Sequence, residues 1–212
     1  MEQPIGIAVG SGTVLEAAVA VPSGARAGVV VCHPHPLYGG DMHGPVVLAV
    51  LEACARAGLA TLRFNFRGVG RSTGVHDGGQ GEQDDAAAAL ADLASRLPAP
   101  ARVAIAGYSF GAVVAAAIAA REPAPVALAL VAPPLGVTGS DAFARLAALR
   151  GPVLVVAGSR DEYCPPALLS RLAKDLSAAS VRVLDGADHF FGGDLDALEA
   201  AVAEWAAGLV AG

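Results

Sequence analysis

The stretch Val103-Ala104-Ile105-Ala106-Gly107-Tyr108-Ser109-Phe110-Gly111 decides the fold, together with the alanine-rich segment that follows it up to Arg121. Its first four residues predict a buried strand, and the residues from Phe110 to Arg121 predict a helix of small residues. Between them stands a Gly-x-Ser-x-Gly pattern centred on Ser109. A serine on so tight a strand-to-helix turn leaves no room for side chains two positions away on either side, and its hydroxyl is exposed above the sheet. We therefore interpret Ser109 as a candidate nucleophile. The N–H of Phe110, at the positive end of the helix dipole, is then a candidate donor to an oxyanion.

A serine nucleophile needs a base, and the base needs an orienting carboxylate. His189 follows the last predicted strand, and Asp161 follows the strand before it. The chain order Ser109, Asp161, His189 is the order of the triad in α/β hydrolases, and all three positions lie at the carboxyl ends of predicted strands. Because Asp188 adjoins His189 in the chain, we expect its side chain to point elsewhere, into a turn. Two further carboxylates compete with Asp161 as the orienting group, Glu162 and Asp185.

Strand-like and helix-like patterns alternate along the rest of the chain. This alternation predicts an α/β fold with a mostly parallel sheet of about eight strands and helices on both faces. The expected strands are Ile5–Val9, Val14–Val21, Ala27–Cys32, Leu59–Asn65, Val103–Ala106, Val126–Ala132, Pro152–Ala157 and Val181–Leu184. The expected helices are Pro45–Ala57, Asp84–Leu97, Phe110–Arg121, a short one near Asp141–Leu149, Pro166–Leu176 and Asp194–Leu209. The first two strands are expected to form an antiparallel hairpin. With no repeat or linker between the elements, we expect one domain over residues 1–212.

Composition and charge argue against several classes of function. The formal net charge of −6 and the pI near 5.3 disfavour nucleic acid or an anionic membrane as a partner. The first residues lack the basic and then apolar order of a signal peptide. The scattered cysteines Cys32, Cys54 and Cys164 form neither a disulfide framework nor a CxxC metal motif. We therefore expect a cytoplasmic protein with reduced thiols.

Two uncharged segments, 103–120 and 123–140, are long enough to suggest membrane spans. Glycines and Ser109 interrupt the first, and prolines interrupt the second. Both are better explained as buried strands with their turns, in a parallel sheet that is covered on both faces.

Several stretches resemble one family. The segment from His33 to Met42 is similar to the HPHP-x-x-GG-x-M segment of small hydrolases of the α/β-hydrolase superfamily. The resemblance extends from about Gly28 to Trp205 and also rests on Asn65–Ser72, Gly81–Ala86, the Gly-Tyr-Ser-Phe-Gly turn and Gly186–Phe191. It implies a lidless, carboxylesterase-like serine hydrolase that acts on small acyl substrates through the triad named above and needs no cofactor.

The HPHP segment follows the predicted strand Ala27–Cys32, where an α/β hydrolase supplies its second oxyanion amide. The two prolines of the segment have no N–H, so the available donors are the amides of His35 and Leu37. By analogy with relatives we favour His35. The choice between the two amides stays open at this point.

The same segment offers an alternative, because histidines two residues apart in an extended chain face one side. A metal site would then be built from His33, His35, Asp41 and His43. A turn that contains prolines explains these histidines without a metal, and we expect no metal.

The charged residues after the strand Leu59–Asn65 are expected to be structural. Arg67 and Arg71 can pair with nearby carboxylates, and Asp84 suits the start of a helix. Substrate contact is the alternative for the two arginines, because such loops often border a site.

The residues expected at the mouth of the site are mostly apolar and favour a small acyl ester, either a carboxylester or a thioester. They are Leu37, Tyr38, Met42, Leu135, Tyr163 and Phe190. The same triad supports an acyltransferase or a peptidase, and a non-catalytic binding module on this fold is a third possibility. The interval 133–151 is too short to bury a core of its own, which predicts a minimal or absent lid. We expect a monomer or a small homo-oligomer whose partner is a small acyl substrate.

Overall fold

The computed structural model describes residues 1–121, 123–140, 142–143, 146, 149, 151–176 and 179–211. An eight-stranded sheet runs through it in the order β1-β2-β4-β3-β5-β6-β7-β8. The strands are β1 Gln3–Val9, β2 Thr13–Ala20, β3 Ala27–Cys32, β4 Ala60–Phe64, β5 Arg102–Tyr108, β6 Leu128–Val131, β7 Val153–Gly158 and β8 Ala179–Leu184. β2 pairs antiparallel with β1 and β4, and all other neighbours are parallel. The mostly parallel sheet and the initial hairpin are thus confirmed.

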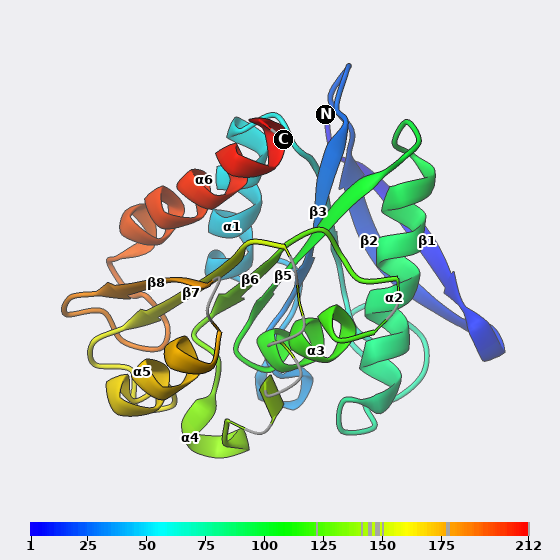
Figure 1. Ribbon diagram of the computed structural model, residues 1–212. Helices are drawn as coiled ribbons and strands as arrows, with labels where there is room; N and C mark the ends of the chain where they lie inside the picture. Colours follow the sequence, from blue (N-terminus) through cyan, green and yellow to red (C-terminus); the bar gives the residue numbers. More distant parts are fainter. Residues whose placement is uncertain are drawn as a thin grey trace.

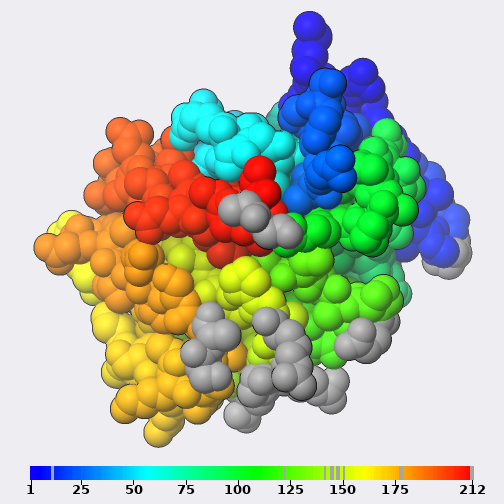
Figure 2. All heavy atoms as spheres, turned by 45° about the horizontal axis from the view of Figure 1, so that its top comes forward, coloured from blue at the N-terminus to red at the C-terminus, as the bar shows by residue number. Residues whose placement is uncertain are grey.

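Helices cover both faces of this sheet (Figure 1). They are α1 Pro45–Arg56, α2 Gln80–Ser95, α3 Phe110–Ala119, α4 Leu135–Thr138, α5 Pro166–Asp175 and α6 Leu195–Ala211. α1 and α6 pack side by side on one face, and α2, α3 and α5 lie on the other. Figure 2 shows α6, in red and orange, beside α1 in cyan.

The strand β3 shows why the chain folds into these layers. All six of its residues are buried. Val30 and Cys32 belong to the core under α2 and α3, whereas Val29 and Val31 belong to the core under α1 and α6. Successive side chains of a strand point to opposite faces, so a continuous apolar run is stable only where both faces are covered.

The start of α2 differs from the prediction. The helix begins at Gln80, and Asp84 is an exposed residue inside it that pairs with Arg121 at 3.6 Å. The carboxylate of Glu82 accepts the N–H of Gly79 at 2.8 Å and so caps the first turn from within. The apolar periodicity starts later than the helix, and for this reason the sequence placed the boundary too far along the chain.

The interval before β7 also differs. The four-residue helix α4 was not expected, and most of the predicted helix near Asp141–Leu149 lies outside the described residues. The described side chains of Phe143 and Leu146 are buried in the core on the α2–α3–α5 face.

The two uncharged segments contain strands, as expected. The first forms β5 and α3, and the second contains β6 and α4. In the described ranges of the chain, no helix is long and apolar enough to cross a membrane.

Candidate active site

Ser109 lies in the turn between β5 and α3 with φ 54° and ψ −116°, a strained conformation for a residue with a side chain. The flanking glycines make this turn possible. A Cβ on Gly107 would overlap the carbonyl oxygen of Gly111, and a Cβ on Gly111 would overlap the carbonyl oxygen of Cys32. The Gly-x-Ser-x-Gly pattern therefore shapes the turn and also brings the end of β3 against the start of α3.

Three loops at the carboxyl ends of β5, β7 and β8 bring Ser109, Asp161 and His189 together. Nε2 of His189 lies 3.0 Å from Oγ of Ser109, and Nδ1 lies 3.0 and 2.9 Å from the two carboxylate oxygens of Asp161. Because a carboxylate accepts hydrogen bonds, these contacts assign the proton of the neutral ring to Nδ1. Nε2 then carries the lone pair that faces the serine hydroxyl.

The structure also decides which carboxylate serves His189. Oδ1 of the buried Asp161 accepts the N–H groups of Tyr163 at 2.8 Å and Cys164 at 2.9 Å, which fixes the orientation of the carboxylate. The side chain of Asp188 caps a turn by accepting the N–H of Phe190 at 2.9 Å, as expected. Of the other two competitors, Asp185 accepts the hydroxyl of Ser159 and Glu162 is exposed.

Tyr108 is a site residue that the sequence reasoning missed. Its buried hydroxyl donates to the main-chain carbonyl of His189 at 3.1 Å. Burial raises the pKa of this phenol, so it stays protonated and remains a donor at neutral pH. The only available signal was its position directly before Ser109, which places it beside the same turn.

The segment after β3 packs against the turn that carries Ser109. The N–H of Leu37 donates to Nδ1 of the His35 ring at 3.2 Å, whereas the N–H of His35 has no hydrogen-bond partner among the described residues. Phe110 is the first residue of α3, where an N–H has no acceptor within the helix. The His35 and Phe110 rings lie 4.9 Å apart, which places the two residues side by side.

His33 is held in a way that leaves no nitrogen for a metal. Its Nδ1 donates to the carbonyl of Pro34 at 2.6 Å, and its Nε2 accepts the N–H of Phe66 at 3.0 Å. Burial lowers its pKa to about 4, so the ring is neutral and joins the ends of β3 and β4. Across the part of the chain that is described, no group of three or more His, Cys, Asp or Glu side chains is arranged to hold a metal ion.

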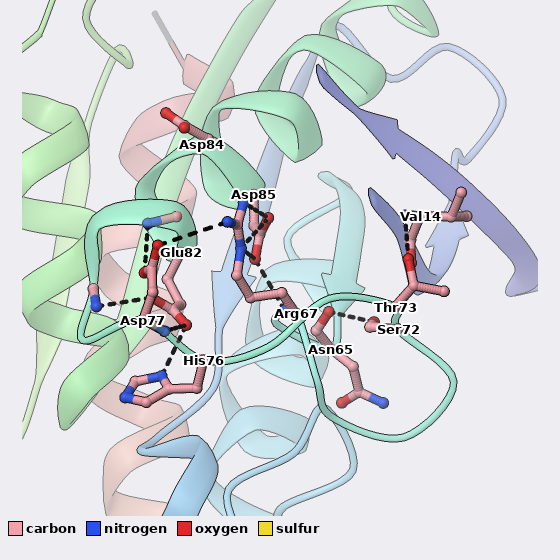
Figure 3. Close-up of polar contacts among 12 residues, drawn as sticks. Val14, Asn65, Arg67, Ser72, Thr73, His76, Asp77, Glu82, Asp84 and Asp85 are labelled. Atoms are coloured by element: carbon pink, nitrogen blue, oxygen red, sulfur yellow. Dashed lines mark hydrogen bonds and ion pairs between the residues drawn. The ribbon is translucent and has the colours of Figure 1, made fainter. Parts of the chain in front are cut away.

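Arg67 and Arg71 form the expected ion pairs. Figure 3 shows the Arg67 guanidinium against the buried carboxylate of Asp85, at 2.7 Å for the closest contact. Arg71 pairs with Glu16 at 2.9 Å. The carboxylates of Asp85 and Glu16 therefore hold the loop after β4 in place, and both arginines have a structural role.

The residues expected at the mouth fall into two groups. Leu37, Tyr38, Tyr163 and Phe190 are exposed, and the rings of the last two lie 4.6 and 5.4 Å from the His189 ring. Met42 and Leu135 are instead buried, with 4% and 1% of their surface exposed. The N–H of Met42 donates to the Asn65 side chain at 2.8 Å, which draws this residue beneath the surface.

Fold and site together define the α/β-hydrolase class, since the strained serine turn, the parallel sheet and the chain order of the three polar residues occur in combination. The chain belongs to this family, because the sequence model of the alpha/beta hydrolase domain matches residues 26–198.

Individual relatives agree with this assignment. An α/β serine hydrolase homologue from Coxiella burnetii is 35% identical, with a TM-score of 0.85 over 95% of this chain and 96% of that chain. A serine hydrolase without lid from Xanthomonas campestris is 31% identical, with a TM-score of 0.84 over 96% of this chain and 92% of that chain. An uncharacterised protein of Rickettsia prowazekii is 34% identical over 168 residues, which are 76% of this chain and 71% of that protein.

Proposed function

We propose that this protein is a serine esterase that cleaves small carboxylesters or thioesters through a covalent acyl-enzyme on Ser109. The observation that carries the proposal is the continuous line of hydrogen bonds from Ser109 through His189 to Asp161. Membership of the α/β-hydrolase family and the serine hydrolases among its relatives support it.

In the first step, Nε2 of His189 takes the proton of the Ser109 hydroxyl while Oγ attacks the carbonyl carbon of the ester. The carbonyl double bond opens and places a negative charge on its oxygen. Asp161 stabilises the imidazolium that forms on His189. The tetrahedral intermediate then collapses, the bond to the leaving group breaks, and His189 gives its proton to the departing oxygen or sulfur.

In the second step, water takes the place of the serine. His189 removes a proton from the water, the resulting hydroxide attacks the acyl-enzyme, and the bond to Oγ breaks. Ser109 regains its proton from His189, and the product is a carboxylic acid.

The oxyanion is held by two backbone N–H groups in this proposal, those of Phe110 and His35. The N–H of Leu37 is already used by the His35 ring, which supports His35 as the second donor. Close packing of Gly111 on the end of β3 brings the two donor segments together.

The exposed side chains of Leu37, Tyr38, Tyr163 and Phe190 support a small, mainly apolar substrate. The same triad performs acyl transfer or peptide hydrolysis when another nucleophile or an amide occupies the site. A panel of ester, thioester and amide substrates, with and without an added acceptor alcohol, separates these reactions.

Ser109→Ala tests the proposal directly. We expect the variant to lose covalent labelling by a fluorophosphonate and to lower kcat by roughly four to six orders of magnitude. Ser170→Ala, which changes an exposed serine on α5, is the matched control and keeps both properties. Labelling of the Ser109→Ala variant, or turnover near the parental rate, would show that the nucleophile lies elsewhere. A parental protein that binds acyl compounds without labelling or turnover would instead be a binding module.

A further inference from the structure

Glu82 is a fully buried carboxylate that the proposed mechanism does not use. It lies in the first turn of α2, where Oε2 accepts the N–H of Gly79 at 2.8 Å and Oε1 accepts the N–H of Asp77 at 3.4 Å. These two contacts explain it as a helix cap. Helix capping does not explain a third contact, in which Oε1 lies 2.8 Å from Nδ1 of His76 (Figure 3).

The contact with Glu82 fixes the ring of His76, whose side chain is 12% exposed. Its ring centroid lies 5.0 Å from that of His35 and 5.5 Å from that of Phe110. The His35 and Phe110 rings are themselves 4.9 Å apart, so the three rings form one cluster. His35 and Phe110 are the two residues whose amides hold the oxyanion in the proposed function.

The His35 side of this cluster is held mainly by its own turn. The carbonyl of His35 accepts the N–H groups of Tyr38 and Gly40 at 3.1 Å each, and its ring lies 4.7 Å from the ring of Tyr38. His35 is followed by a single 3-10 turn, η2 Pro36–Tyr38, and the residues from Leu37 to Gly39 are exposed. The loop that carries His76 is held from outside that turn, because the Arg67–Asp85 ion pair and the cap of α2 fix both ends of the loop. In the described part of the chain, the ring contacts of His35 outside its own turn are those with His76 and Phe110, and His76 is anchored to α2 through Glu82.

We propose that His76, oriented by Glu82, is a positioning residue that holds His35 and Phe110 in register for oxyanion binding. The inference rests on the proposed function. Stabilisation of an oxyanion depends on the donors being in place before the charge develops, and a displacement of about 1 Å costs on the order of a hundredfold in rate. The His76 ring acts by packing, so another flat ring of similar size can replace it.

The first test compares His76→Ala with His76→Phe, using 4-nitrophenyl acetate as the substrate. We expect His76→Ala to lower kcat about tenfold, with KM changed by less than about twofold, because the substrate binds but its oxyanion is poorly held. His76→Phe restores kcat to within about threefold of the parent. Arg71→Ala is the control in the same loop, since this arginine is 80% exposed and pairs with Glu16, and it leaves kcat unchanged.

The thermal midpoint and the rate of fluorophosphonate labelling, measured on the same samples, separate positioning from folding. The proposal expects His76→Ala to label more slowly than the parent while it remains folded at the assay temperature. If kcat per labelled serine in His76→Ala equals that of the parent, or if His76→Phe is as impaired as His76→Ala, the proposal is overturned. A parental protein that neither labels nor hydrolyses esters overturns the proposed function and this inference with it.

The role of Glu82 is tested by a double-mutant cycle. Glu82→Gln keeps the shape of the side chain but weakens its hold on His76, and we expect it to lower kcat about threefold in the parent. In the His76→Ala background the same substitution has no further effect on kcat. An equal decrease in both backgrounds would mean that Glu82 acts independently of His76.

Discussion

Backbone strain in this protein is concentrated in the loops that follow the carboxyl ends of the strands. In the described part of the chain, three non-glycine residues have positive φ: Ser109 at 54°, Ala132 at 44° and Phe191 at 53°. Each follows the carboxyl end of a strand, at the edge of the sheet where Asp161 and His189 also lie. Such conformations cost about 1–3 kcal/mol each and persist only where the surroundings enforce them. Main-chain hydrogen bonds from Ser109 to Val131 and from Ala132 to Val156 supply part of that enforcement.

The buried ring of His33 is expected to make the free energy of unfolding depend on pH. An unfolded histidine has a pKa near 6.5, whereas burial lowers the pKa of His33 to about 4 in the folded protein. At a pH between these two pKa values, His33 binds a proton in the unfolded chain but not in the folded chain. The contribution of His33 to the free energy of unfolding is therefore complete above about pH 6.5 and is lost as the pH falls toward 4. We expect about 2 kcal/mol of the decrease in unfolding free energy between about pH 7.5 and pH 5 to come from this residue.

His33→Asn removes the titrating group and is the variant to measure. Urea unfolding at the two pH values should show that this part of the decrease is absent from His33→Asn. The variant is also expected to be about 1–3 kcal/mol less stable at neutral pH, because the imidazole that joins Pro34 and Phe66 is gone. An identical pH dependence in both proteins would contradict the assignment of a neutral buried ring.

At the scale of elements, the contact between α3 and β3 decides how the site is assembled. Gly111 lies in the first turn of α3 and touches the carbonyl oxygens of Cys32 and His33 so closely that no side chain fits. The hydrogen-bonded register of β3 with β5 pairs Cys32 with Gly107. Backbone packing thereby brings the turn with Ser109 against the segment with His35.

Two glycine-to-alanine substitutions in helices test this contact. Gly208→Ala in α6 adds a Cβ that meets nothing within 4 Å, and helix propensity should raise the unfolding free energy by about 0.5–1 kcal/mol. Gly111→Ala gains the same propensity but drives a Cβ into the backbone of β3, and we expect a loss of about 3 kcal/mol or more. Thermal unfolding of the two variants and the parent shows whether Gly208→Ala is more stable than the parent and Gly111→Ala less stable. Equal stability of the two variants would mean that β3 yields easily at this point.

On the scale of the whole molecule, the site lies at one edge of the sheet, beside the exposed side chains of Tyr163 and Phe190. The interval in which many α/β hydrolases carry a cap holds the four-residue helix α4, and the described side chains of Phe143 and Leu146 pack into the core. Apolar side chains that are buried in the core are not available to cover the site.

The length of the acyl chain of the substrate tests the prediction that the site is open and has no lid. We expect turnover of 4-nitrophenyl acetate and butyrate to exceed that of the octanoate and dodecanoate, because a shallow site leaves a long acyl chain in water. Rates should follow substrate concentration smoothly through the micelle threshold. A sudden increase at that threshold, with the long-chain esters preferred, would identify the interval 133–151 as a lid.

The amino-acid sequence is enough to predict the class of fold and the three residues Ser109, Asp161 and His189, which the structure brings together. These features are encoded locally. An apolar run between turn residues predicts a buried strand, and two glycines around a serine, between a strand and a helix, predict the tight turn of a nucleophile. The three polar residues follow the strands β5, β7 and β8, whose carboxyl ends lie at the same edge of the sheet.

The side-chain and main-chain contacts at those strand ends depend instead on how the loops pack in three dimensions. The amide of Leu37 is taken by the His35 ring, Met42 is drawn beneath the surface by Asn65, and Tyr108 reaches the main chain of His189. The early start of α2 likewise depends on a buried Glu82 that bonds to Gly79 and His76. Except for the turn at His35, these contacts depend on burial and on the packing of loops against one another. Neither the periodicity of apolar residues nor the spacing of motifs in the sequence depends on that packing, so the sequence does not predict these contacts.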